Sequence, residues 1–146
     1  MSKPRTSERA RRIQASPIRK LAGIADRAKA EGKHVYHLNI GQPDIHTPPG
    51  FWEAVRDNTP EVLAYGPSQG IPQLREAIRV YYQRDGIQLD TDEILITTGG
   101  SEAVVFAMLA TCDPGDEIVC FEPFYTNYNG FATIAGVKLV PITSEV

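Results

Sequence analysis

Residues 94–109, with the sequence ILITTGGSEAVVFAML, place a glycine pair and a serine where a strand-like segment meets a helix-like one. A β-rich half comes first, Gly99 and Gly100 follow, and Ser101 opens an apolar run of helical length. The first N–H groups of a helix have no carbonyl partner and lie at the positive end of its dipole, so such a terminus can bind a phosphate. A glycine pair also suits an ordinary tight connection, and both interpretations fit the pair alone.

Two common phosphate-binding motifs do not fit this stretch. A dinucleotide-binding site needs the pattern G-x-G-x-x-G and an acid about twenty residues later; Glu122 has nearly that separation, but GGSEAV lacks the second and third glycines. A P-loop is excluded because no G-K-S/T follows. The Ser101 hydroxyl can donate to a phosphate oxygen beside the N–H groups of Gly100 and Glu102. The Glu102 carboxylate would repel a phosphate unless it points away and stabilises the helix start.

The composition limits the class of protein and its partners. With 146 residues, 42% of them hydrophobic and 23% charged, the chain has the make-up of a soluble globular protein of about one domain. A net charge of −3 argues against nucleic acid as the main partner, and no apolar run is long enough to span a bilayer. Cys112 and Cys120 have neither metal-ligand spacing nor the density of a disulfide framework, which favours a reducing, cytoplasmic location.

The histidines and the N-terminal residues carry no chemistry of their own. His34, His37 and His46 have no spacing typical of metal ligands or of a general base, so we treat them as structural and predict no metal site. The first twelve residues hold five basic residues and one acid without an apolar segment, which is not a secretory signal. We expect residues 1–15 to form a basic, solvated and mobile tail.

Helical and strand-like segments alternate along the rest of the chain. Ser16 before Pro17 is typical of a helix start, and apolar residues at helical spacing predict a helix that Gly32 ends. Further helices are expected over residues 50–58, 72–81, 101–111 and about 125–135, strands over 34–40, 94–98, 117–121 and 137–142, and irregular structure at GQPDIHTPP and YGPSQG. This alternation predicts an α/β fold with a mainly parallel sheet sandwiched by helices.

The predicted sheet is incomplete. The strand over residues 137–142 ends without the crossover helix that would cover it. The alternating part of the chain after residue 93 supplies three strands, over residues 94–98, 117–121 and 137–142, where parallel sheets usually have more. We therefore expect the chain to be part of a larger α/β domain.

Four sequence blocks together resemble one known family. In order and spacing, LNIGQPDIHTP, YGPSQGIPQLREAI, ILITTGGSEAV and DPGDEIVCFEPFYTNY are similar to the N-terminal part of class I/II aminotransferases of the aspartate aminotransferase superfamily, the fold-type I enzymes that use pyridoxal 5′-phosphate (PLP). The resemblance covers residues 16–146. It implies a homodimer with cofactor sites at the subunit boundary, residues 16–48 contributing to the small domain and interface, and residues 49–146 forming the first part of the large domain.

The resemblance also assigns candidate site residues. It puts the phosphate-binding turn at Gly100, Ser101 and Glu102. It implies that Tyr125 stacks on the pyridine ring, that Tyr65 reaches the partner subunit's cofactor phosphate, and that the backbone of Gly41 lies against the substrate carboxylate. From the residues alone, ordinary helix packing is the favoured interpretation of Tyr125, and Tyr65 and Gly41 could be ordinary turn residues.

The family's covalent chemistry has no counterpart among these residues. None of the five lysines stands in a context that resembles the family's Schiff-base lysine motif; they are Lys3, Lys20, Lys29, Lys33 and Lys138. The resemblance therefore implies a fragment that is inactive alone, from an enzyme that moves an amino group between an amino acid and a 2-oxo acid. A non-catalytic or nucleotide-binding α/β module that has kept the sheet and lost the chemistry is the alternative.

Overall fold

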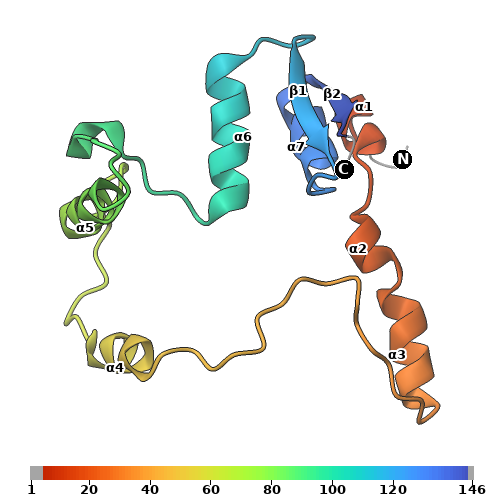
Figure 1. Cartoon of the computed structure of the whole chain (residues 1–146), viewed down its shortest axis with the longest axis horizontal. Helices are drawn as coiled ribbons and strands as arrows, with labels where there is room; N and C mark the ends of the chain where they lie inside the picture. Colours follow the sequence, from red (N-terminus) through yellow and green to blue (C-terminus); the bar gives the residue numbers. More distant parts are fainter. Residues whose placement is uncertain (1–4, 145–146) are drawn as a thin grey trace. The chain divides into compact units, whose positions relative to one another are not determined.

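The computed structural model describes residues 5–144, which belong to two compact units. The sheet unit comprises the residues up to 41 and those from 98 onward, and the helical unit comprises residues 42–97. The sheet unit contains α1 (Glu8–Arg12), α2 (Pro17–Lys20), α3 (Ala22–Ala30), α6 (Gly100–Thr111), β1 (Glu117–Glu122), α7 (Tyr128–Ala135) and β2 (Lys138–Thr143) (Figure 1). The helical unit contains α4 (Pro49–Asp57), α5 (Pro72–Gln83) and the 3-10 turn η1 (Thr91–Glu93).

The two strands of the sheet unit form a parallel pair that is linked by a helix. β1 and β2 start with Glu117 opposite Lys138, and α7 connects them (Figure 1). Parallel neighbours cannot be joined by a hairpin, so the chain crosses over through the helix. Gly136 ends α7 in the left-handed conformation, with φ +80°. The Gly115 N–H donates to the Gly136 carbonyl oxygen at 2.9 Å, which ties together the starts of both strands.

A small core lies between α6, α7 and the start of β2. Its buried members are Met108, Ala132, Ala135 and Val137, and partly buried hydrophobic residues such as Val104 and Phe131 pack against them. α6 is apolar on every face: Met108 is buried in the core, whereas Phe106 is 44% and Leu109 54% exposed. The core holds α6 against α7 and so fixes the start of α6 relative to the start of α7.

In the helical unit, Arg75 ties α5 to the segment that follows it. Its guanidinium donates to the carbonyl oxygen of Ile94 at 3.0 Å and to that of Thr91. Gly70, just before α5, has φ +98°, and a Cβ at this position would overlap the side chain of Ile96. Glycine is therefore required at the end of the YGPSQG segment, which is irregular as predicted.

The structure confirms the α/β fold class and most of the predicted elements. The helices expected over residues 50–58, 72–81 and 101–111 correspond to α4, α5 and α6. The strands expected over residues 117–121 and 137–142 correspond to β1 and β2. The turn between α6 and β1 and the glycine that ends α7 also lie where the sequence predicts them.

Two predicted strands are wrong. Residues 34–40 and 94–98 form no strand. Without residues 94–98, the sheet of the described residues has two strands instead of the expected three. The Ile96 N–H donates to the Gln69 carbonyl at 3.0 Å, but a single bond does not make a ladder. A β-rich segment becomes a strand only when another strand pairs with it, and local sequence does not supply that partner.

Two predicted helices also differ from the structure. The helix expected from Pro17 is divided at Leu21 into α2 and α3, because the Leu21 N–H bonds to the nearby Arg19 carbonyl. The side chain of Ser16 makes no cap hydrogen bond. α7 begins at Tyr128, three residues after the expected start, and residues 125–127 form a turn that leads into it.

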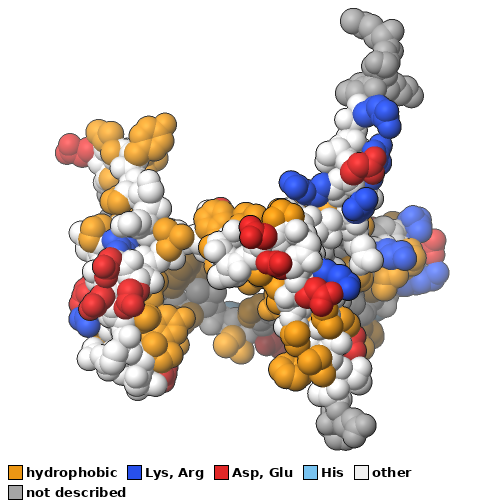
Figure 2. All heavy atoms as spheres, turned by 90° about the horizontal axis from the view of Figure 1, so that it is seen from above, with side chains coloured by type: hydrophobic (Ala, Val, Ile, Leu, Met, Phe, Trp, Pro, Cys, Tyr) orange, Lys and Arg blue, Asp and Glu red, His pale blue; other side chains and the backbone are white. Residues whose placement is uncertain are grey.

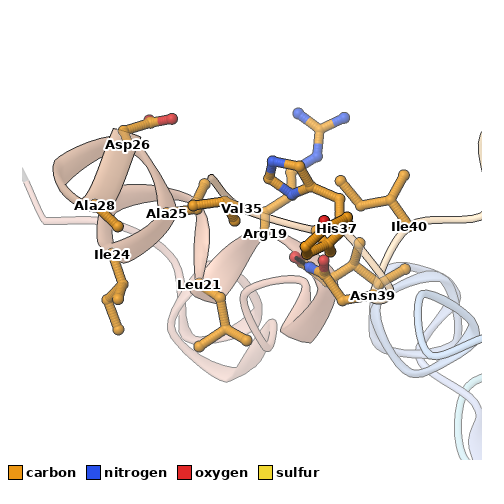
Figure 3. A pocket seen from close by; sticks show the side chains of 13 residues that line it. Arg19, Leu21, Ile24, Ala25, Asp26, Ala28, Val35, His37, Asn39 and Ile40 are labelled. Atoms are coloured by element: carbon orange, nitrogen blue, oxygen red, sulfur yellow. Dashed lines mark hydrogen bonds between the residues drawn. The ribbon is translucent and has the colours of Figure 1, made fainter. Parts of the chain in front are cut away.

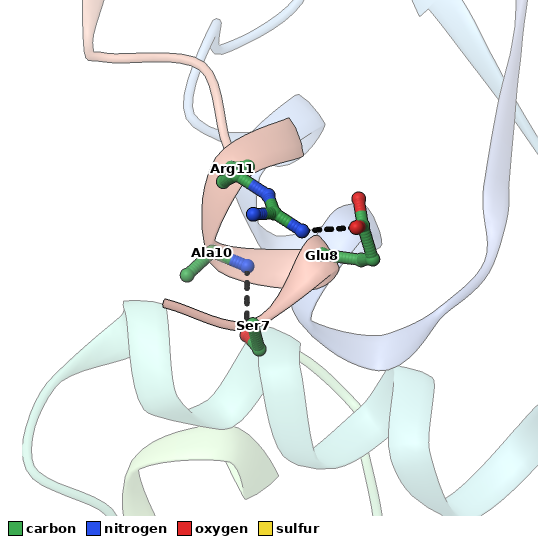
Figure 4. A network of polar contacts seen from close by, with 4 residues as sticks. All are labelled: Ser7, Glu8, Ala10 and Arg11. Atoms are coloured by element: carbon green, nitrogen blue, oxygen red, sulfur yellow. Dashed lines mark hydrogen bonds and ion pairs between the residues drawn. The ribbon is translucent and has the colours of Figure 1, made fainter. Parts of the chain in front are cut away.

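The short helix α1 lies within residues 1–15, which we expect from the sequence to be a tail and of which residues 1–4 lie outside the described part of the chain. Ser7 caps it by accepting a hydrogen bond from the Ala10 N–H at 3.1 Å, and Arg11 pairs with Glu8 (Figure 4). α1 packs against α7. The division into a tail, a small-domain segment and part of a large domain stays a prediction.

Many large hydrophobic side chains lie at the surface of the described residues. Leu38 and Leu63 are more than nine-tenths exposed, and hydrophobic side chains are visible over the face drawn in Figure 2. Across residues 5–144, no helix combines the length and apolar character needed to cross a membrane.

Candidate functional site

Gly99 and Gly100 form the start of α6. The reason for glycine differs between the two positions. Gly99 is the N-cap and has φ +83° and ψ 171°, a conformation that is essentially restricted to glycine. Gly100 is the first helical residue, and a Cβ placed on it would meet nothing within 4 Å. The backbone conformation therefore requires Gly99, whereas glycine at position 100 leaves open space beside the helix start.

The Glu102 carboxylate is turned back toward the segment before the helix. Its Oε2 accepts a hydrogen bond from the Thr98 N–H at 2.6 Å, and the side chain is half-buried. This is the arrangement that the sequence analysis required for an acid beside a phosphate site. The side chain of Glu102 stabilises the turn, and its backbone N–H stays in the first turn of α6.

A cavity of about 340 Å³ opens between the start of α6 and the start of α7. Gly100, Ser101 and Val104 line it from α6, and the rings of Tyr125, Tyr128 and Phe131 line it from the opposite side. Its volume is in the range of small-molecule sites. The structure therefore brings together three of the predicted site residues, namely Gly100, Ser101 and Tyr125.

The ring of Tyr125 belongs to an aromatic cluster. It contacts Tyr128 edge-on, with ring centroids 5.6 Å apart, and Phe131 at 6.4 Å. The Asn127 Nδ2 donates to the Tyr125 hydroxyl oxygen at 2.5 Å. The side chain of Tyr125 is 46% exposed, so part of the ring remains free to contact a ligand. A flat ring in this position can stack on an aromatic ligand.

The remaining predicted residues are not part of this cavity lining. Tyr65 lies in the helical unit, in the irregular segment before α5, and its side chain is fully exposed. Gly41 lies in an irregular segment and is the last residue of the first stretch of the sheet unit. A Cβ placed on it would meet nothing within 4 Å. Their assigned contacts stay predictions.

Sequence reasoning missed several residues around the cavity. Tyr128 and Phe131 follow Tyr125 at successive spacings of three, which is a helical signal for one shared face. That spacing could have suggested an aromatic wall. The hydrogen bond between Asn127 and Tyr125 has no such signal, because it depends on the turn before α7.

Two surface ion pairs shift pKa values outside the cavity lining. The hydrogen bond from Arg79 lowers the pKa of Glu76, and the same contact raises the pKa of Arg79. The hydrogen bond with Glu117 raises the pKa of Lys138 at the start of β2. All four side chains are solvated, so we assign these pairs to surface electrostatics.

A second hollow of about 340 Å³ lies along α2 and α3 (Figure 3). Its lining is mostly aliphatic and includes Leu21, Ile24 and Val35. Asn39 donates to the Ile18 carbonyl at 2.8 Å and ties the irregular segment to α2. None of the predicted site residues lines this hollow. The part of the chain that the structure describes also has no cluster of residues suited to hold a metal ion.

Fold and site together define an α/β protein with a small-molecule cavity at a helix N-terminus. Residues 33–145 match the family Aminotransferase class I and II, and the chain belongs to this family. It corresponds to the N-terminal part of the family's fold.

Individual relatives agree with this assignment. The chain is 35% identical to an aspartate aminotransferase of Rhizobium meliloti over 143 residues, covering 97% of this chain and 35% of that protein. The crystal structure of an aspartate aminotransferase from Thermotoga maritima has a TM-score of 0.85 and 30% identity, covering 96% of this chain and 38% of that one. An alanine aminotransferase from Pyrococcus furiosus has a TM-score of 0.83 and 31% identity, with coverages of 97% and 37%. The chain spans about a third of the length of the curated relatives that it matches.

Proposed function

We propose that the protein is an aminotransferase that moves an amino group from an amino acid to a 2-oxo acid with PLP as cofactor, and that this chain supplies part of the cofactor site. The observation that carries the proposal is the shared cavity of Gly100, Ser101 and Tyr125, in a chain of the class I and II family. Because the chain spans about a third of its relatives, the proposal assigns it binding and orientation and does not assign it the covalent step.

The residues present fit the phosphate of PLP. The first turn of α6 offers N–H groups that have no carbonyl partner within the helix, together with the positive end of the dipole. The Ser101 hydroxyl lines the cavity and can donate a further hydrogen bond. The open space beside Gly100 lets a phosphate oxygen approach the backbone. The Glu102 carboxylate is bonded to Thr98, so it contributes to the turn while its backbone N–H remains a donor.

The aromatic side of the cavity fits the pyridine ring. Tyr125 can stack on that ring, and Tyr128 and Phe131 contact Tyr125 and line the same cavity beside it. When bound, the cofactor supplies the electron sink for amino transfer. The part of this chain is to hold the phosphate at α6 and orient the ring against Tyr125.

The proposal extends to contacts outside this cavity. We propose a cytoplasmic homodimer in which Tyr65 donates to the cofactor phosphate of the partner subunit and the Gly41 backbone lies against the substrate carboxylate. The exposure of Tyr65 supports this, because a side chain that contacts a second subunit is free in the isolated chain.

The test uses the whole protein. Binding of PLP is measured by quenching of protein fluorescence, and amino transfer is measured with a panel of amino acids and 2-oxo acids. We expect PLP binding that Ser101→Ala and Tyr125→Ala each weaken, and transfer for at least one pair. No PLP binding and no transfer would contradict the proposal.

A further inference from the structure

Asn127, which directly precedes α7, makes no cap hydrogen bond with its side chain. Its backbone is already helical, with φ −69° and ψ −14°, whereas a capping residue is normally extended. The N–H groups of Tyr128 and Asn129 donate to the carbonyl oxygens of Tyr125 and Thr126, so the helix start does not need the Asn127 side chain. The Asn127 side chain is therefore available for another contact.

The side chain of Asn127 is used on the ring of Tyr125 instead. Its Nδ2 donates to the Tyr125 hydroxyl oxygen at 2.5 Å. The ring also contacts Tyr128 edge-on and Phe131. These contacts all come from the chain itself, so side chains of the protein fix the ring. Such preorganisation lowers the entropy that a ligand must otherwise supply to order its site.

The nearby Asn129 provides a contrast. Its Nδ2 donates to the Thr126 carbonyl at 3.2 Å, and its own carbonyl accepts from the Thr133 hydroxyl at 2.8 Å. These bonds lie within the turn and the helix, and none of them involves Tyr125. Asn127 and Asn129, two residues apart at the start of α7, therefore make different contacts. Asn129 bonds to the local backbone, and Asn127 bonds to the cavity wall.

We propose that Asn127 is a positioning residue that fixes the ring of Tyr125 at the cavity wall. Its relevance to the cofactor rests on the proposed function, because Tyr125 is there the stacking partner of PLP. The holding of the ring itself needs no cofactor, so the two parts can be tested separately.

The central variant is Asn127→Ser in the whole protein. The serine hydroxyl is too short to reach the Tyr125 oxygen, and no cap hydrogen bond is lost because the Asn127 side chain makes none. We expect the melting temperature of the cofactor-free protein to stay nearly unchanged. We expect the NMR signals of ring-labelled Tyr125 to show faster ring flipping, and the PLP dissociation constant to rise by about two- to tenfold, the scale of one hydrogen bond.

Two further variants make the comparison specific. Asn129→Ser removes a local bond of the same kind and should change neither the Tyr125 signals nor PLP affinity. Tyr125→Phe identifies the Tyr125 signals among the six tyrosines and removes the acceptor. In that background Asn127→Ser should have no further effect on PLP affinity, because the two side chains act through one contact.

The possible results separate the two claims. Unchanged Tyr125 ring flipping in Asn127→Ser overturns the positioning role, and so does a fall in melting temperature without a change at Tyr125. Faster ring flipping with unchanged PLP affinity supports the positioning role and contradicts the stacking role that the proposed function gives to Tyr125.

Discussion

Two hollows of the sheet unit have the same volume, about 340 Å³, but are built in different ways. The hollow along α2 and α3 is lined mostly by aliphatic side chains, with Tyr36 and His37 among the exceptions, on short helices and on an irregular segment. The cavity between α6 and α7 has a glycine turn on one side and an aromatic wall on the other, with the buried core behind it. Volume alone does not distinguish them. A site is recognised by donors and rings that rigid elements hold in place.

The largest expected effect comes from removing the support behind the cavity. Met108→Ala should lower the free energy of unfolding by about 2–5 kcal/mol, because it leaves a void in the core between α6 and α7. Ile24→Ala in the other hollow, where the side chain is 57% exposed, should change it by about 0.5 kcal/mol or less. Urea denaturation measures both values. Equal losses would show that the two hollows are equally supported.

The glycine turn should respond differently at its two positions. Gly99→Ala should lower the free energy of unfolding by about 1–3 kcal/mol, because only glycine readily adopts its backbone conformation. Gly100→Ala should raise it by about 0.4–1 kcal/mol, since the added methyl group meets open space. Calorimetry without cofactor measures both. If Gly100→Ala is more stable but binds PLP more weakly, the space beside Gly100 is needed for the ligand. Unchanged PLP binding would show that this space has no role in binding.

An aromatic side chain should contribute to PLP affinity in the cavity between α6 and α7 and not in the hollow along α2 and α3. Tyr125→Ala should weaken PLP binding by about 1–3 kcal/mol through loss of a large contact with a flat ring. Tyr36→Ala in the other hollow serves as the matched control and should leave PLP binding unchanged. Fluorescence titration measures both affinities. If the two variants behave alike, Tyr125 is an ordinary packing residue.

The smallest effect is expected from Tyr65, which lies outside both hollows. Tyr65→Phe should raise the PLP dissociation constant by about tenfold or less, the scale of one hydrogen bond to a charged group. In mixed dimers of Tyr65→Phe subunits with subunits disabled at the reactive lysine, the defect should appear at the neighbour's site. A defect confined to the mutated subunit's own site would rule out the contact between subunits.

The elements that the sequence predicts correctly are those with local signals. Pro72 starts α5, Gly136 ends α7, and the apolar run after Gly100 forms α6. Residues 34–40 and 94–98 have the composition of strands, but a strand also needs a partner, which composition does not supply. Strands therefore cannot be predicted from local sequence alone, because strand pairing is a tertiary contact.

The candidate site divides in the same way. Gly100, Ser101 and Tyr125 could be named in advance because they stand in recognisable blocks, and the structure puts all three around one cavity. Asn127 could not, because its bond to Tyr125 depends on a turn where the sequence predicts a helix. The sequence predicts the start of α7 three residues too early. For that reason it does not identify Asn127 as a candidate positioning residue.

The apolar surface of α6 has a practical consequence for work with this chain. A helix that is apolar all round is normally buried all round, yet here Phe106 and Leu109 remain in water. Such a surface adheres to other copies of the chain, to chaperones and to chromatography media. Replacing these two side chains with polar ones should therefore improve recovery during expression and purification.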